Sequence, residues 1–267
     1  MNAPAPAAMR APAAHGQPAP PVLLTEGLTR RFGGFHAVRN VSFTLNEGEI
    51  HGLIGPNGAG KSTLFNLVTR MLPASSGRIL YRGQDISRMP PARVARMGLV
   101  RSFQISALFG EMTSRQNLHV ALMRGSGLGW RAWMPDRSLR RFDPAAQDIA
   151  ARVGLTDVLD QPAAALSYGR KRALELGMAL ALDPGVLLLD EPLAGMGHED
   201  IDTVCDLIRD AARGRTVLMV EHNLGVVERL CDRVTVLQRG EVIASGDYTD
   251  IAAHPQVRSA YLGAEDD

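Results

Sequence analysis

The chain has 267 residues, enough for one large domain or for one domain with a subdomain. Its formal net charge is +1 and charged residues make up 21% of it, so there is no bulk field that would favour nucleic acid as a partner. No stretch approaches the roughly 18 uninterrupted apolar residues of a membrane span. We therefore expect a cytoplasmic chain that reaches a membrane only through its partners.

The N-terminal part divides into a tail and a hairpin. Residues 1–21 are rich in Ala and Pro with no apolar block, which predicts a disordered tail and not a secretory signal. Residues 22–29 and 37–45 then predict two strands around a glycine-rich turn. Phe32 lies at that turn, where its ring can stack on a purine, although the local pattern fits a core or surface phenylalanine equally well.

A glycine-rich loop follows the short apolar run 50–54 and precedes a helical pattern. The spacing is Gly, four residues, then Gly-Lys-Ser, a pattern in which backbone N–H groups and the helix N-terminus surround phosphate. The alternative is a glycine-rich turn with a solvated lysine, but both flanks favour nucleotide binding. The residues of the predicted cradle are Gly55, Pro56, Asn57, Gly58, Ala59, Gly60, Lys61, Ser62 and Thr63.

The use of lysine supports this interpretation. Lysine and arginine together number 29, yet lysine occurs only at Lys61 and Lys171. A compact ammonium fits between phosphates where a planar guanidinium does not. We expect Lys61 to reach the β- and γ-phosphates, Ser62 to ligate Mg²⁺ and Thr63 to contact an outer phosphate.

The middle of the chain changes character. Residues 100–104 predict a strand that ends at Gln104, on the ligand edge of an α/β sheet. From about 106 to 182 the helical runs predict an inserted helical subdomain. Within it, the Trp- and Arg-rich loop 124–142 fits a partner surface and a solvated loop equally well.

Ser167 is a good N-cap for the helical pattern that follows it, and Ser167 with Gly169 forms a second possible anion site. An ordinary capped helix is the alternative.

Two later strands end in polar residues. The fully apolar run 186–189 is followed by Asp190 and Glu191, and such a run is typical of a central parallel strand. We expect Asp190 to hold the Mg²⁺ shell and Glu191 to orient or deprotonate a water molecule, because charged groups after a buried strand are costly without such partners. The next strand, 216–220, leads to His222 at the same edge.

Taken together and in this order, these segments resemble the nucleotide-binding subunit of an ABC transporter over about residues 22–263. The resemblance implies an α/β fold with a P-loop NTPase core, an N-terminal antiparallel β subdomain, the inserted helical subdomain and a C-terminal hairpin with short helices at about 233–263. It implies ATP and Mg²⁺ as cofactors. The motifs that carry it are the Walker A loop at 55–63, the Q-loop Gln104, the signature at 166–170, the Walker B strand 186–190, Glu191, the switch His222 and the adenine-stacking Phe32.

The resemblance also implies roles for these residues. Glu191, His222, Gln104 and Lys61 are the catalytic set, and Ser62, Gln104 and Asp190 are the metal set. Two subunits pair head to tail, so that Ser167 and Gly169 of one cover the ATP bound by the other. The implied partners are permease subunits, a second ATPase subunit (self or sister) and, indirectly, a periplasmic solute-binding protein, on the cytoplasmic face of the inner membrane, with no nucleic acid.

Some features are similar to ATPases of branched-chain amino-acid importers, among them the 101–104 segment, the variant signature 166–169 and the C-terminal 260–263. The ATPases of urea and amide importers share much of this pattern, so they are alternative functions. The ATPase of a lipopolysaccharide-type exporter and a non-transport switch ATPase are two further alternatives. Three features depart from the family pattern: Tyr168 and Arg170 in the signature, Gly197 where an Asp is common, and Phe32 where the adenine-stacking residue is usually Tyr.

We predict that Lys61→Ala weakens ATP binding, because the ammonium is the cation of the phosphate cradle. Titration with a fluorescent ATP analogue measures the effect. Full affinity in the variant would contradict the cradle.

Overall fold

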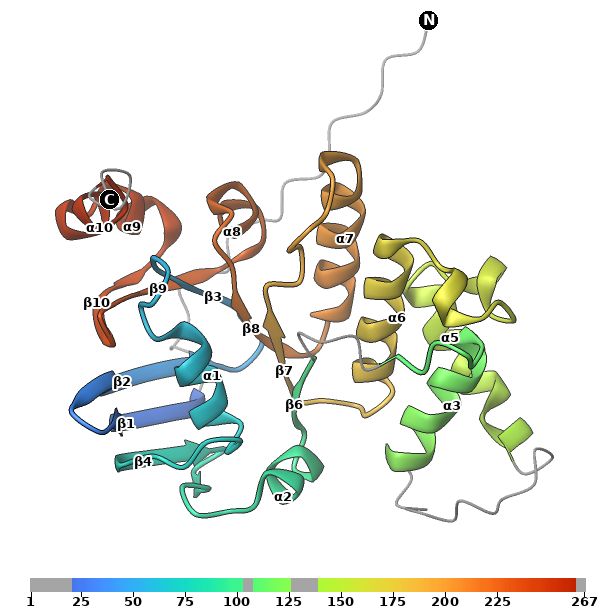
Figure 1. The fold of residues 1–267 in the computed structure, drawn as a ribbon, viewed down its shortest axis with the longest axis horizontal. Coiled ribbons are helices and arrows are strands. Elements are labelled where there is room, and N and C mark those ends of the chain that lie inside the picture. The colour runs from blue at the N-terminus through green and yellow to red at the C-terminus, as the bar shows by residue number, and fades with distance from the viewer. Residues whose placement is uncertain (1–20, 103–107, 126–138, 263–267) are drawn as a thin grey trace, which may run out of the picture.

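The computed structural model describes residues 21–102, 108–125 and 139–262, and these residues form two β-sheets with helices around and beside them (Figure 1). The larger sheet has the order β10-β9-β3-β8-β7-β6, and the smaller has the order β2-β1-β4-β5. The fold is α/β, as the sequence predicts.

The larger sheet is parallel except at one edge. β3 (Ile50–Ile54) lies between β8 (Thr216–Val220) and β9 (Arg233–Gln238), and β7 (Val186–Asp190) lies between β8 and β6 (Leu99–Arg101). β10 (Glu241–Gly246) pairs antiparallel with β9. Every residue of β3, β7 and β8 is buried, which explains why these strands are mostly apolar, with polar side chains only at His51, Asp190 and Thr216.

The smaller sheet is antiparallel and consists of β1 (Pro21–Phe32), β2 (Phe35–Asn46), β4 (Ser76–Tyr81) and β5 (Gln84–Asp85). α1 (Lys61–Val68) packs between the two sheets, because its buried face joins one apolar cluster with residues of both. α2 (Pro91–Arg96) then leads to β6.

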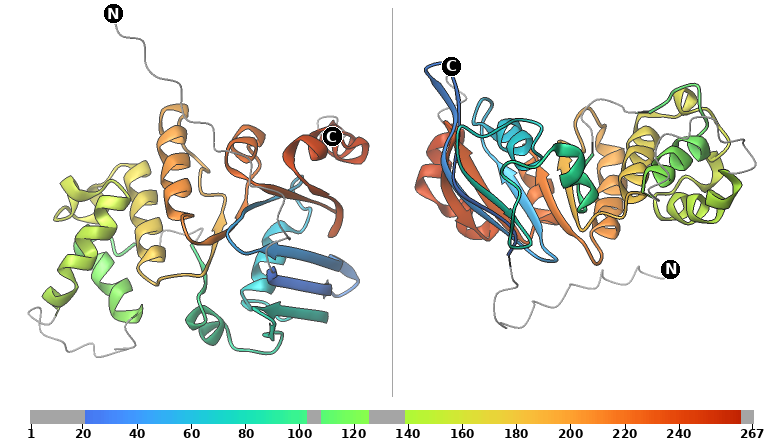
Figure 2. Two further views of the ribbon diagram at one scale, coloured as in Figure 1. Left: turned by 180° about the vertical axis from the view of Figure 1, so that it is seen from behind. Right: turned by 90° about the horizontal axis from the view of Figure 1, so that it is seen from below.

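A group of helices lies at the opposite end of the larger sheet from the antiparallel sheet (Figure 2). It contains α3 (Ser114–Gly125), α5 (Asp143–Arg152) and α6 (Tyr168–Leu180), with the 3₁₀ turns Arg140–Phe142, Thr156–Val158 and Ala163–Ala165. The predicted limits of the helical subdomain, about 106–182, stay a prediction. In the described part of the chain, no helix is long and apolar enough to cross a bilayer.

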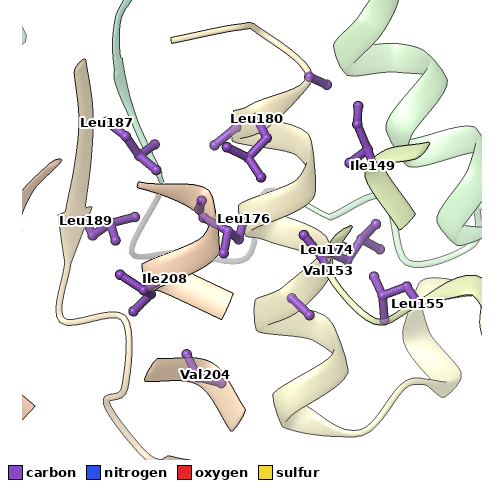
Figure 3. Packing of buried hydrophobic residues seen from close by; sticks show 14 of the residues in the cluster. Ile149, Val153, Leu155, Leu174, Leu176, Leu180, Leu187, Leu189, Val204 and Ile208 are labelled. Atoms are coloured by element: carbon purple, nitrogen blue, oxygen red, sulfur yellow. The ribbon is translucent and has the colours of Figure 1, made fainter. Parts of the chain in front are cut away.

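α6 is the helix that joins this group to the larger sheet. Figure 3 shows Leu176 and Leu180 of α6 near Leu187 and Leu189 of β7, with Ile208 of the neighbouring α7 (His198–Ala211) in the same layer. On its other side α6 faces α5. The helix is therefore packed on both sides, and its position depends on the sheet.

The remaining helices are short. α8 (Leu224–Leu230) begins after Asn223, whose side chain accepts a hydrogen bond from the Val226 amide. α9 (Tyr248–Ala253) and α10 (Pro255–Leu262) close the chain beside the β9–β10 hairpin.

The structure differs from the predicted elements mainly at their ends. β1 runs to Phe32 and not to residue 29, because its pairing with β2 continues to the turn. β6 is described only to Arg101, and Gln104 lies outside the described residues, as do residues 1–20 of the predicted tail and the centre of the Trp- and Arg-rich loop. α6 begins at Tyr168, five residues before the apolar pattern at 173, because Ser167 caps it there.

We predict that Leu174→Ala lowers the free energy of unfolding by about 2–5 kcal/mol, because Leu174 is fully buried in the cluster around α6. Urea unfolding measures the loss. Leu224→Ala is the matched control: Leu224 is 38% exposed, and we expect a change within about 0.5 kcal/mol. Equal losses in both variants would contradict the assignment of Leu174 to the core.

Candidate functional site

The glycine-rich loop joins β3 to α1, and its glycines are required by the backbone around them. Gly55, Gly58 and Gly60 all have positive φ, of 150°, 76° and 101°. A Cβ at Gly55 would collide with the carbonyl oxygen of Leu237, and one at Gly60 would collide with that of Ala37. Gly55 and Gly60 therefore have no room for a side chain, while Gly58 is favoured by its positive φ alone, and the convergence of the loop amides on phosphate stays a prediction.

Lys61, the first residue of α1, lies inside this loop. Its side chain is buried and donates to the carbonyl oxygens of Gly55, at 2.7 Å, and Pro56, at 3.0 Å. Burial lowers the pKa of Lys61, and the charges of Glu191 and then Asp190 oppose that decrease. Lys61 thus interacts electrostatically with Asp190, the last residue of β7, and with Glu191, which follows it.

The other predicted cradle residues differ in their access to solvent. Asn57, Gly58 and Ser62 are exposed, Pro56, Gly60 and Thr63 are half-buried, and Gly55 and Ala59 are buried. The hydroxyl-bearing side chains therefore lie toward the surface, while the backbone of the loop is anchored below. A ligand reaches the loop from its solvent side.

Asp190 ends β7 and is only 3% exposed. One carboxylate oxygen, Oδ2, forms an ion pair with Arg101 at 2.5 Å. The other oxygen, Oδ1, has no hydrogen-bond partner among the described residues. A buried carboxylate with one free oxygen suits a cation, because an unpaired buried acceptor is otherwise unfavourable.

Arg101 is a site residue that the sequence analysis missed. It is the last residue of β6, and besides Asp190 it donates to the Asn66 side chain of α1 at 2.6 Å. The sequence showed a charged residue at a strand end, which needs a partner if it is buried, but it did not show that the partner is Asp190, 89 residues away.

Glu191 follows Asp190 in a backbone conformation unusual for its residue type, with φ of +46°. Its amide still donates to the carbonyl of Val220 at 2.9 Å, which continues the pairing of β7 with β8. This left-handed conformation turns the chain away from the direction of the strand directly after Asp190 and so separates the two acids, and such strain is typical of functional positions.

His222 lies beyond β8 with an exposed side chain, and its Nδ1 is 4.0 Å from a carboxylate oxygen of Glu221. Glu221 itself is buried and accepts from the amides of Leu193 at 3.3 Å and His222 at 3.2 Å. Burial raises the pKa of Glu221, and these hydrogen bonds partly offset the increase. Glu221 thus joins the loop after β7 to the loop after β8, another link that the sequence did not reveal.

The second predicted anion site lies at the start of α6. Ser167 caps the helix, accepting from the Arg170 amide at 3.4 Å, and both Ser167 and Tyr168 are exposed. The Arg170 side chain forms an exposed ion pair with Asp157 of the helical group at 2.7 Å. Ser167 is exposed and Gly169 is half-buried, and their contact with a partner's nucleotide stays a prediction.

The remaining predicted residues are less constrained. Phe32 is 47% exposed, and the Arg30 guanidinium lies 4.6 Å from its ring centroid. Its stacking on adenine stays a prediction, as does every role of Gln104. Gly197, where the family commonly has Asp, provides no side-chain cap to α7.

The site offers few protein ligands for a metal. Among the described residues, no three His, Cys, Asp or Glu side chains are grouped to hold an ion. Mg²⁺ is usually bound by one or two carboxylates together with substrate phosphates, and Asp190, with its free Oδ1, provides one such carboxylate. The residues present fit a magnesium–nucleotide complex, with phosphate oxygens and water completing the shell.

Comparison with known proteins agrees with this geometry. Residues 38–194 match the family model described as ABC transporter, and residues 241–267 match the one described as branched-chain amino acid ATP-binding cassette transporter. The chain is 39% identical over 250 residues to the high-affinity branched-chain amino acid transport ATP-binding protein LivG of Escherichia coli K12, covering 91% of this chain and 98% of LivG. BraF of Pseudomonas aeruginosa, which has the same description, is 37% identical with the same coverage.

Among solved structures, the ADP conformation of an ATP-binding cassette of an ABC transporter matches with a TM-score of 0.81 and 31% identity, covering 92% of this chain and all of that one. A nucleotide-free cassette from an ABC transporter matches with a TM-score of 0.79 and 30% identity, covering 90% and 98%.

We predict that Arg101→Ala lowers the free energy of unfolding by about 3–5 kcal/mol, because it leaves the Asp190 carboxylate buried without its partner. Chemical denaturation measures the loss. Arg213→Ala, which removes an exposed ion pair with Asp210, is the control, and we expect less than about 1 kcal/mol. A similar small loss for Arg101→Ala would show that the buried pair is not needed.

Proposed function

Because the chain belongs to the ABC transporter family of ATP-binding proteins, we propose that it is the ATP-hydrolysing subunit that powers an importer of branched-chain or other hydrophobic amino acids. The single observation that carries the chemistry is that Arg101 joins Asp190, at the end of β7, to Asn66 of α1, the helix that begins at Lys61 of the phosphate loop. The solute rests on the names of the relatives and on the match of the C-terminal segment.

The residues of this chain have separate tasks in hydrolysis. The loop amides and Lys61 bind the β- and γ-phosphates, and Lys61 exchanges its carbonyl partners for phosphate oxygens. Glu191 orients a water molecule and accepts its proton as the oxygen attacks the γ-phosphorus. The bond from that phosphorus to the bridging oxygen then breaks, and ADP leaves. His222 contacts the γ-phosphate from the end of β8.

Ser62, Gln104 and Asp190 are the residues that hold Mg²⁺ in this proposal. When bound, the ion neutralises charge on the β- and γ-phosphate oxygens. Arg101 keeps the Asp190 carboxylate oriented by binding the oxygen that faces away from the free Oδ1.

We further propose that two such subunits, identical or sister, pair head to tail, with Ser167 and Gly169 of each covering the nucleotide of the other. The exposure of Ser167 at a helix N-terminus supports this, since its partner is then another chain. The pair attaches to permease subunits at the cytoplasmic face of the membrane and acts with a periplasmic solute-binding protein. No residue that selects the solute is assigned to this chain.

We predict that Glu191→Gln binds ATP with nearly unchanged affinity, forms a stable ATP-bound dimer and loses hydrolysis by a factor of about 10²–10⁴, because the groups that bind remain and only the proton acceptor is removed. Size-exclusion chromatography with ATP and a phosphate-release assay measure both effects. Glu241→Gln, at an exposed ion pair with Arg39, is the control and retains activity. Unchanged turnover in Glu191→Gln would remove Glu191 from its role.

The importer assignment has its own test. Detergent extracts are passed over the tagged chain, and the membrane proteins that co-elute are identified. Permease subunits together with a solute-binding protein that takes branched-chain amino acids support the proposal. A urea- or amide-binding protein, or a lipid-export assembly, would replace the solute class while leaving the ATPase in place.

A further inference from the structure

The first turn of α6 carries a side chain that reaches out of the helical group to the loop after β7. The Tyr168 hydroxyl donates to the carbonyl oxygen of Ala194 at 2.6 Å. The Ala194 amide in turn donates to the carbonyl of Glu191 at 3.1 Å. A Cβ at Gly195 would lie 3.3 Å from the tyrosine oxygen, so the loop passes close to the ring. One hydrogen bond therefore joins the N-terminus of α6 to the turn that carries Glu191.

Tyr168 is held in this position although it is 45% exposed. Arg172, one turn further along α6, donates to the Tyr168 oxygen at 2.9 Å, and its guanidinium lies 5.3 Å from the ring centroid. The other end of that guanidinium pairs with Glu175 at 2.8 Å. Both side chains of this pair are at least 85% buried. The ion pair with Glu175 holds the Arg172 guanidinium in place, and this guanidinium donates to the Tyr168 oxygen. The Tyr168 hydroxyl is therefore kept directed at the Ala194 carbonyl.

The same helix is also packed against the strand that ends at Asp190. Arg172, Glu175 and Asp190 line one small cavity of about 30 Å³ between β7, α6 and α7. Figure 3 shows Leu176 of α6 in the layer that holds Leu189 of β7. A movement of the α6 N-terminus therefore reaches the Glu191 turn directly through Tyr168, while the body of the helix remains supported by the sheet.

The Tyr168–Ala194 hydrogen bond joins two segments that act on different nucleotides in the proposed dimer. On the pairing described under Proposed function, Ser167 and Gly169 cover the partner's ATP, whereas Glu191 acts on the ATP of its own chain. Tyr168 stands between Ser167 and Gly169 in sequence and contacts the Glu191 turn in space. The residue thus connects the two nucleotide sites within one chain.

We propose that Tyr168 is a positioning residue, which couples the binding of the partner's nucleotide at the α6 N-terminus to the placement of Glu191 in its own chain. The inference rests on the proposed pairing. Tyr168 touches neither the phosphates nor the attacking water in this proposal, and it acts through Ala194.

The first experiment uses the single chain and needs no partner. Hydrogen–deuterium exchange is followed at the amides of Ala194 and Met196. These amides donate hydrogen bonds to the carbonyl oxygens of Glu191 and Leu193. We expect Tyr168→Phe to speed their exchange about threefold to tenfold, because the hydroxyl that holds the loop is lost. Tyr248→Phe, on α9, is the matched control and leaves these amides unchanged. Equal exchange in both variants would overturn the inference.

The second experiment places the change in one subunit of a dimer. Two differently tagged copies are combined so that one has Glu191 and the other carries Glu191→Gln, and only the nucleotide on the first copy is hydrolysed. We expect Tyr168→Phe in the copy with Glu191 to lower turnover about fivefold to tenfold, with the ATP concentration for half-maximal rate unchanged within twofold. In the other copy, whose Ser167 covers the hydrolysed ATP, we expect less than a twofold change.

The outcomes separate the alternatives. If Tyr168→Phe lowers turnover only when it lies in the Glu191→Gln copy, Tyr168 acts on the partner's nucleotide and the inference is overturned. Equal losses of turnover in both placements would overturn it as well. Failure of Glu191→Gln copies to form an ATP-dependent dimer would contradict the pairing of identical subunits. In that case the exchange measurement still decides whether Tyr168 holds the Glu191 turn.

Discussion

The ion pair between Arg101 and Asp190 is the interaction on which the geometry of the site depends. It joins the ends of β6 and β7, and through Asn66 it reaches the helix that follows the phosphate loop. A carboxylate as buried as Asp190 would be strongly unfavourable without a cation beside it. With Arg101 in place, one carboxylate oxygen is neutralised and the other stays free, so the strand end is stable before any ligand arrives and still has an oxygen for one.

Around this pair, backbone contacts and backbone conformation hold the positive charge of Lys61 apart from the negative charge of Glu191. Lys61 is held by two carbonyl oxygens of its own loop, and the left-handed turn at Glu191 carries the second acid away from the direction of the strand. Glu221 then fixes the loop after β7 by accepting from the Leu193 amide. Lys61, Asp190 and Glu221 thus each have a partner within the chain, and in the proposed complex a triphosphate replaces the carbonyl partners of Lys61.

Much of this could be predicted from the sequence, for physical reasons. The buried strands β7 and β8 are nearly continuous apolar runs, and the polar residues at and after their ends mark one edge of the sheet. The loop at 55–60 was recognisable by its spacing of glycines, two of which, Gly55 and Gly60, have no room for a Cβ. Arg101 and Glu221 were missed because their partners lie 89 and 28 residues away, and pairings at such separation leave no periodic pattern. Tyr168 was noted only as a departure, since its contact with Ala194 depends on how α6 meets the sheet.

The contact between the phosphate loop and the β9–β10 hairpin has a consequence for the synthesis of the chain. The Ala59 carbonyl accepts from the amide of Gly240, and Gly55 packs against the carbonyl of Leu237. The ribosome makes the loop first, and the hairpin that closes it follows about 180 residues later. The nascent chain therefore has an incomplete pocket until the hairpin emerges, and the nucleotide stabilises the fold only after that point.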